Sequence, residues 1–145
     1  MKKFLCFFVF ICSLGLQAKA DEVTFEASAP PSVPLNERFQ LSYTINSDQV
    51  RDFRAPDLSA FNVLMGPAST VGTYSSNVNG SFQSVTTTTL TYTLMGKEEG
   101  TFNIEPATAK IKKANYSSNA LVIKILPPDE KPAENNQSQE SNDSP

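Results

Sequence analysis

The residue types that carry most protein chemistry are scarce in this sequence. The 145 residues include no histidine and no tryptophan, and the only two cysteines are Cys6 and Cys12. Histidine and cysteine are the usual transition-metal ligands, and they also supply the common general base and the thiol nucleophile. Chemistry would therefore have to come from carboxylates, which act either as calcium ligands or as an acid–base pair.

Neither carboxylate arrangement is evident in the sequence. A calcium loop needs clustered acids, as in Asp-x-Asp-x-Asp-Gly, whereas Asp48, Asp52 and Asp57 are spread out. The adjacent pair Glu98-Glu99 precedes Gly100, where solvated turn residues are the ordinary explanation. The sequence therefore predicts no catalytic residue, no cofactor and no metal ion, and we expect a protein that is not an enzyme.

Alternating apolar and polar residues predict the elements of the fold. Phe39, Leu41, Tyr43 and Ile45 alternate with polar residues, which is the period of a half-buried strand. No window of the sequence has a sustained helical period. We predict an all-β, immunoglobulin-like antiparallel β-sandwich of about seven to nine strands. Its predicted core is Val23, Phe25, Phe39, Leu41, Tyr43, Ile45, Leu90, Tyr92, Leu94, Phe102, Ile104, Leu121, Ile123 and Ile125.

The middle of the chain predicts a hairpin. Asn79-Gly80 is the strongest two-residue hairpin signal, and it joins a polar stretch to a threonine-rich strand. Before that stretch, residues 61–65 read as a short apolar strand that Gly66-Pro67 is expected to end.

The two ends of the chain differ from the middle. Residues 1–20 have a positive start, a short apolar run and the small-x-small pattern Ala18-Lys19-Ala20, so we predict a signal peptide cleaved after Ala20. An uncleaved anchor and a lipoprotein are weaker alternatives, the latter because bulky residues precede both cysteines. The folded domain is then expected over residues 21–128. Residues 129–145 are rich in Pro, Glu, Asn, Gln and Ser, and predict a disordered tail or a linker.

The charge balance argues against nucleic acid as a partner. Lys2, Lys3 and Lys19 lie in the predicted signal, so its removal leaves 9 basic and 15 acidic residues, a net charge of −6. Binding to nucleic acid depends on cations that neutralise phosphates. We therefore expect no nucleic-acid binding. We also expect no membrane span in the mature chain.

Two groups of aromatic residues allow more than one interpretation. Phe53 lies between Arg51 and Arg54, where it could be an exposed anchor for a partner, although a core residue on a strand between solvated arginines is favoured. A carbohydrate-binding surface would need exposed flat rings, for which Tyr74, Phe82 and Tyr116 are the candidates.

Several segments, in order along the chain, resemble the first domain of the BatD, or oxygen-tolerance, family. They are Glu37–Ile45, Asp52–Pro56, Phe61–Pro67, Tyr92–Met95, Glu99–Ile104 and Tyr116–Asn119, followed by a last strand and Pro127-Pro128. The resemblance covers about residues 22–128. It implies no catalytic or binding residues that could be carried over to this chain.

The resemblance implies an exported protein of tandem β-sandwich domains, usually anchored by a C-terminal membrane helix. Such proteins are linked to aerotolerance and envelope stress, with von Willebrand A-type membrane proteins as partners and a MoxR-type ATPase in the same systems. This sequence departs from that pattern, because no second sandwich or membrane segment follows. Residues 127–145 resemble the linker to a next domain, so the chain is either truncated there or a free one-domain relative.

Together, these observations predict an exported, non-catalytic protein–protein interaction module of the bacterial periplasm or envelope. The partner, the binding residues and the oligomeric state are left unassigned by the sequence. The alternative is a carbohydrate-binding β-sandwich.

Overall fold

The computed structural model describes residues 22–130, and every regular element in that range is a strand. The predicted signal peptide, its cleavage site, both cysteines and most of the predicted tail lie outside the described residues. The ten strands are β1 (Phe25–Ser28), β2 (Ser32–Pro34), β3 (Arg38–Ile45), β4 (Val50–Arg54), β5 (Phe61–Val78), β6 (Ser81–Gly96), β7 (Gly100–Ile104), β8 (Thr108–Ile111), β9 (Ala114–Ser117) and β10 (Leu121–Leu126). In this part of the chain no helix has the length and apolar character needed to cross a membrane.

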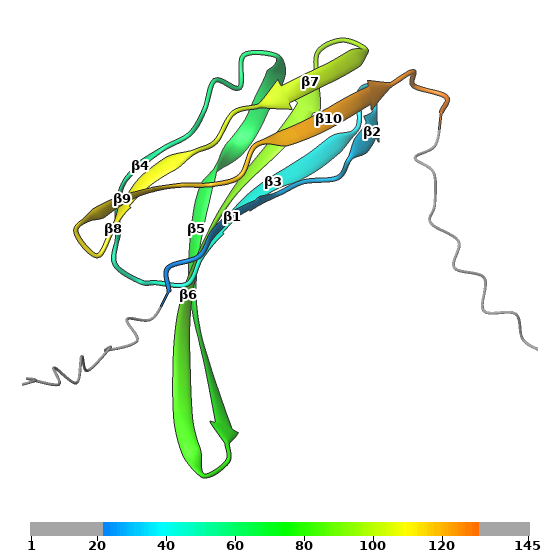
Figure 1. Cartoon of the computed structure of the whole chain (residues 1–145). Coiled ribbons are helices and arrows are strands. Elements are labelled where there is room, and N and C mark those ends of the chain that lie inside the picture. The colour runs from blue at the N-terminus through cyan, green and yellow to red at the C-terminus, as the bar shows by residue number, and fades with distance from the viewer. Residues whose placement is uncertain (1–21, 131–145) are drawn as a thin grey trace, which may run out of the picture.

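The strands form two layers, as Figure 1 shows. One layer is a four-stranded sheet with the order β1-β3-β6-β5. The other layer contains two three-stranded sheets, with the orders β2-β10-β7 and β4-β8-β9. All pairs are antiparallel except β2 with β10, which is parallel. The predicted all-β sandwich is therefore confirmed.

The core fills the space between the layers because β3 and β6 bury the same face. The two strands pair from Arg38↔Met95 to Ile45↔Thr88, so their inward residues lie opposite one another. Residues of β7 and β10 cover the main part of this face, while Ala109 and Ile111 of β8 cover its end at Ile45. Each large aliphatic side chain buried in this way contributes roughly 1.5–3 kcal/mol.

Aromatic rings and one amide connect the layers further. Tyr43 packs edge-on against Phe53 at 5.3 Å between ring centroids, and Phe61 packs against Phe102 at 5.6 Å. The side chain of Asn119, in the loop before β10, accepts a hydrogen bond from the amide of Ala27 at 2.8 Å and donates one to its carbonyl at 3.1 Å. These two hydrogen bonds to β1 hold the edge of the four-stranded sheet against the second layer.

The predicted core agrees well with the structure. Ten of its fourteen residues are buried, and the other four are partly buried and pack against the core: Val23, Phe25, Phe102 and Leu121. Phe53 is also partly buried against the core, between Arg51 and Arg54, which are exposed. The structure therefore agrees with its favoured interpretation as a core residue.

Two local predictions differ from the structure. Gly66-Pro67 does not end the strand that begins at Phe61, because β5 continues to Val78 through register shifts between Val63 and Ala68. The neighbouring β6 continues on both sides of this irregularity, so it keeps β5 in the sheet.

The strand count is ten rather than seven to nine. Short strands such as β2, which follows Pro30-Pro31, and β9 carry little period-two signal; β2 lies at a sheet edge, where proline is tolerated.

Two glycines of the four-stranded sheet give a matched test of the packing. A Cβ added at Gly96 would lie 2.9 Å from side-chain carbons of Ile125, which is buried, whereas a Cβ added at Gly72 would meet nothing within 4 Å. We expect Gly96→Ala to lower the free energy of unfolding by about 1–3 kcal/mol, because the core is overpacked there. Gly72→Ala should change it by less than about 0.5 kcal/mol. Urea denaturation measures both, and equal midpoints would contradict this packing.

The buried Tyr43 predicts a loss of stability in alkali. Burial raises the pKa of Tyr43 to about 12, and the neighbouring Tyr92 acts in the same direction. A tyrosine in the unfolded chain ionises near pH 10, so between about pH 10 and 12 the native state holds a proton that the unfolded state has lost. The free energy of unfolding should therefore fall over this range, by on the order of 2 kcal/mol from Tyr43.

In Tyr43→Phe the free energy of unfolding should fall less between pH 10 and 12 than in the wild type. Part of the fall should remain, because burial also raises the pKa of Tyr92. Within the described residues the Tyr43 hydroxyl has no hydrogen-bond partner, so the substitution should cost little stability at pH 7. Tyr74→Phe, which removes an exposed hydroxyl, is the control. The measurement is the urea midpoint of each protein at pH 8 and at pH 11. If the midpoint of Tyr43→Phe falls between these pH values as much as that of the wild type, the prediction is wrong.

Candidate functional site

The most unusual feature of the fold is a two-stranded ribbon that extends beyond the sandwich. Strand β3 stops pairing with β6 at Ile45↔Thr88, but β5 and β6 continue together to a turn at Asn79-Gly80. We call residues 72–87 the arm. Figure 1 shows it projecting away from both layers. The turn follows from the sequence, because Asn79 and Gly80 take the positive φ angles of 52° and 78° that this type of hairpin requires.

The register gives the arm two different faces. On one face Tyr74 lies opposite Val85, and Val78 lies nearer the tip. On the other face the hydroxyls of Thr73 and Thr86 lie 3.3 Å apart and those of Ser75 and Ser84 lie 3.4 Å apart. Phe82 continues this hydroxyl-lined face toward the tip, opposite Asn77. The arm is therefore polar by composition but presents separate apolar groups on both faces.

Exposed apolar side chains concentrate on the two strands that build the arm. Within the described residues, the large hydrophobic side chains that are exposed are Val63, Leu64, Met65, Val71, Tyr74, Val78, Phe82, Val85 and Val122, and only Val122 lies outside β5 and β6. Tyr74 is 74% exposed and Phe82 is 75% exposed. Single exposed apolar residues are common, but a concentration of them on one hairpin is typical of an interaction surface.

The base of the arm is fixed to the sandwich by the turn after β3. The hydroxyl of Thr88, which is buried, donates a hydrogen bond to the carbonyl of Ser47. Asn46 in the same turn accepts a hydrogen bond from the amide of Thr24 and donates one to the carbonyl of Glu22, both at 2.7 Å. The arm is therefore attached where β1, β3 and β6 meet.

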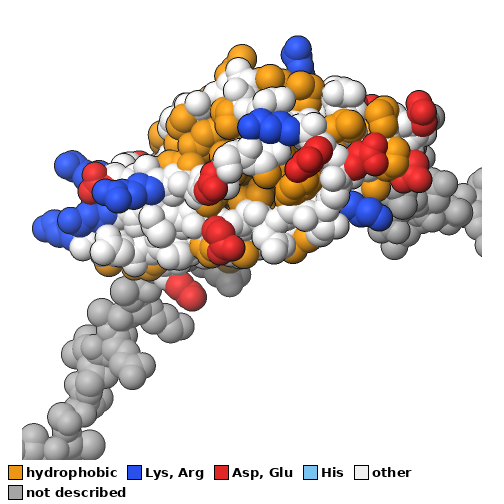
Figure 2. Space-filling view, turned by 90° about the horizontal axis from the view of Figure 1, so that it is seen from above, with side chains coloured by type: hydrophobic (Ala, Val, Ile, Leu, Met, Phe, Trp, Pro, Cys, Tyr) orange, Lys and Arg blue, Asp and Glu red, His pale blue; other side chains and the backbone are white. Residues whose placement is uncertain are grey.

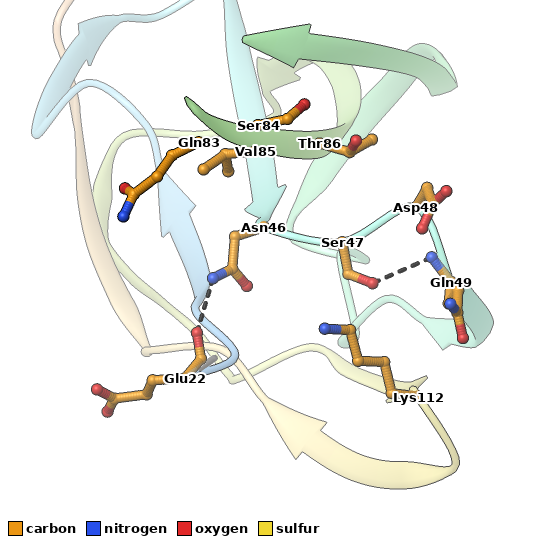
Figure 3. A pocket seen from close by; sticks show the side chains of 10 residues that line it. All are labelled: Glu22, Asn46, Ser47, Asp48, Gln49, Gln83, Ser84, Val85, Thr86 and Lys112. Atoms are coloured by element: carbon orange, nitrogen blue, oxygen red, sulfur yellow. Dashed lines mark hydrogen bonds between the residues drawn. The ribbon is translucent and has the colours of Figure 1, made fainter. Parts of the chain in front are cut away.

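A polar hollow of about 490 Å³ lies between the arm and this turn. Figure 3 shows Gln83, Ser84, Val85 and Thr86 of β6 on one side, with Glu22, residues 46–49 and Lys112 on the other. The hollow therefore lies along the β6 edge of the arm, near its base. Its lining is mixed in charge, with Glu22, Asp48 and Lys112 contributing single groups from different elements.

The acids singled out in the sequence lie apart. In the described range of the chain, no three residues among His, Cys, Asp and Glu are grouped as a metal site requires. Asp57 accepts a hydrogen bond from the amide of Ser59 at 2.9 Å, and this bond lowers the pKa of its carboxyl. Glu98 and Glu99 are exposed in the turn between β6 and β7. Apart from the neighbours Glu98 and Glu99, the described part of the chain thus groups none of these carboxylates as a metal site would require.

Cations gather at one end of the sandwich instead (Figure 2). There Arg51, Lys110, Lys112 and Lys113 border a second hollow together with Asp52. The positive φ angles of Lys112 and Lys113, 49° and 72°, place them in the turn between β8 and β9. All four cations are exposed; Arg51 and Lys110 lie opposite one another on β4 and β8, and Lys112 and Lys113 form the turn.

The three aromatic candidates for a carbohydrate platform lie on different surfaces. Tyr74 and Phe82 are both in the arm but on opposite faces. Tyr116 is on β9 in the other layer, where it is partly buried against Ile45, Ala109 and Ile111. These three rings therefore do not form one flat surface for a sugar.

Sequence reasoning found the turn of the arm but not the arm itself. One signal was available: residues 58–96 contain no Asp, Glu, Lys or Arg. A long uncharged stretch that is rich in threonine and serine, with scattered aromatic residues, is unusual for a sheet edge that faces solvent.

The sequence of the domain also matches a known family. A family model described as the BatD DUF11-like domain matches residues 26–125, more than half of the chain. The match begins in β1 and ends in β10, so it includes both layers and the arm. No protein of curated function matches the sequence significantly.

Thr88→Val tests the attachment of the arm. The substitution removes the hydroxyl that bonds the Ser47 carbonyl but keeps a β-branched side chain of similar shape. We expect it to lower the free energy of unfolding by about 1–2 kcal/mol, because a carbonyl at a buried site loses its partner. Thr87→Val, one residue away on the opposite face, is the matched control and should be nearly neutral. Equal urea midpoints for the two variants would contradict the anchoring role of Thr88.

Proposed function

Because the chain belongs to the BatD family, we propose that its sandwich is a non-catalytic interaction module of the bacterial cell envelope and that the arm is its binding element. The observation that carries this proposal is the arm itself. It combines exposed apolar side chains, an absence of charge and backbone groups at an open sheet edge.

The arm suits protein recognition for two physical reasons. The two edges of the arm present unpaired backbone amides and carbonyls, because residues 81–87 of β6 pair with β5 and not with β3, and such edges can add a strand from another chain. Tyr74 and Phe82 are large amphipathic or apolar groups at positions where a partner can cover them, and such residues dominate the free energy of binding at interfaces. Backbone pairing would supply affinity, and the rings would supply selectivity.

The absence of a catalytic role is part of the same proposal. The sequence has no histidine, and the carboxylates that might replace it are exposed and separate. The hollow beside the arm and the hollow at the cationic end are lined by polar residues and by charged groups from separate turns and strands. A binding role requires only exposed apolar side chains and open strand edges, which the arm provides. A catalysed reaction would require several reactive side chains close together.

The proposed partners follow from the family. The resemblance points to von Willebrand A-type membrane proteins in a system for aerotolerance or envelope stress, so we propose that the protein acts on the outer side of the inner membrane or elsewhere in the envelope. The acidic sequence pI of 4.9 is consistent with a protein partner rather than nucleic acid.

A shortened arm gives a direct test. Deleting residues 73–78 and 81–86 leaves Asn79-Gly80 to join Gly72 and Thr87, which already lie opposite one another in the ladder. The deletion removes an even number of residues from each strand, so the inward and outward faces are kept. Immobilised wild-type protein should enrich a von Willebrand A-type membrane protein from an envelope extract, and the shortened variant should enrich it at least about tenfold less.

Val122→Lys serves as the control, because Val122 is an exposed apolar residue on a strand of the other layer. It should bind the partner as the wild type does. All three proteins are compared only after urea unfolding has established that they are folded. If the shortened variant recovers the same membrane protein as efficiently as the wild type, the arm is not the binding element.

A further inference from the structure

The outer edge of β5 in the arm is open and regular. β5 is the last strand of its sheet, and after the register shifts it pairs residue by residue with β6 from Ala68 to Val78. The backbone groups that point away from β6 therefore form an even row, which another strand can match. The other edge of the arm differs, because near its base β6 faces the turn at residues 46–49 across the polar hollow.

This β5 edge has none of the usual protection against pairing. Natural edge strands carry charged residues, short lengths or inward-pointing lysines that prevent association. β5, which spans Phe61–Val78, contains no charged residue, and its neighbour β6 contains none either. Its exposed side chains Val71, Tyr74 and Val78 are apolar or aromatic. The bulged region near Gly66 protects only the part of β5 next to the sandwich.

The distribution of charge favours a second copy of the chain as the occupant. The chain has a net charge of −3, and every one of its charged residues lies outside residues 58–96. Two copies that approach through other surfaces bring like net charges together, whereas two arms meet without charge on either side. The β5 edge is thus the surface at which like-charged molecules can associate at the least electrostatic cost.

The residues around Tyr74 are compatible with self-pairing about a two-fold axis. In an antiparallel pair centred on Tyr74, Gly72 lies beside Ser76 of the copy, and Thr70 lies beside Val78 of the copy. At the axis Tyr74 lies beside Tyr74 of the copy as a cross-strand aromatic pair, and no pair brings two charges together. The result is a four-stranded sheet in place of two ribbons, and a two-stranded ribbon alone is only marginally stable in water.

We propose that the β5 edge of the arm pairs antiparallel with the β5 edge of a second copy of this chain, forming a two-fold symmetric dimer. The proposal rests on the arm being a binding element, as argued for the function above. It identifies the partner at one of the two edges of the arm. The β6 edge and the hydroxyl-lined face of the arm remain available to another protein.

The test is the mass of the protein, produced from its full sequence, over a wide range of concentration by sedimentation equilibrium. The wild type should shift from monomer to dimer. Tyr74→Lys adds a charge at the proposed two-fold axis, where it meets its own copy, and should weaken the dimer at least tenfold. Val122→Lys adds the same charge on the other layer and should leave dimerisation unchanged. Both positions are exposed, so urea unfolding is expected to confirm that both variants fold.

Two results would overturn the inference: a wild-type protein that stays monomeric at the highest concentration, or a Tyr74→Lys variant that dimerises as tightly as the wild type. Capture of the membrane partner by the same proteins separates this inference from the proposed function. A monomeric wild type whose capture depends on the arm keeps the function and rejects the dimer. A dimer dissolved by Tyr74→Lys, together with capture that survives shortening of the arm, supports the dimer and rejects the function.

Discussion

The antiparallel ladder between β3 and β6 is the interaction around which the described structure is arranged. It sets the inward residues of the two strands opposite one another, so that Leu41, Tyr43 and Leu94 form one apolar surface. Both sheets of the second layer pack on that surface. The chain contains cysteine only at Cys6 and Cys12, outside the described residues, so no disulfide supports this core. Its stability depends on burial and on a few buried hydrogen bonds such as that from Thr88.

The arm is a consequence of unequal strand lengths in that ladder. β3 ends at Ile45, whereas β6 begins at Ser81, so within residues 22–130 the first part of β6 pairs with β5 alone. At the point of separation, Thr88 and the turn after β3 bind the base of the ribbon. Beyond it, the ribbon has no core to join, and its apolar side chains remain exposed. The same ladder that stabilises the sandwich therefore also creates the proposed binding element.

The comparison of prediction with structure separates local from non-local causes. The strand at Phe39–Ile45 and the turn at Asn79-Gly80 were predictable, because alternation and turn chemistry are local properties. Gly66-Pro67 was expected to end a strand, but β6 pairs with β5 on both sides of it, and a neighbouring strand is invisible to a local pattern. The length of the arm was unpredictable for the same reason, since it depends on where β3 stops. Phe53 was placed correctly as a core residue, although the register shift between Arg51 and Arg54 and the positive φ angle of Asp52 interrupt the alternation of this strand.

Hydrogen exchange along β6 tests the central claim most directly, because the claim is that one strand has two environments. In dilute solution, amides at residues 89–95, which lie between β3 and β5, should exchange only with global or near-global unfolding. Amides at residues 81–87, in the ribbon, should exchange at least about a hundredfold faster, with the change falling at Thr88. Uniform protection along the whole of β6 in dilute solution would mean that the ribbon is packed against the sandwich, and it would contradict an arm that is free to bind.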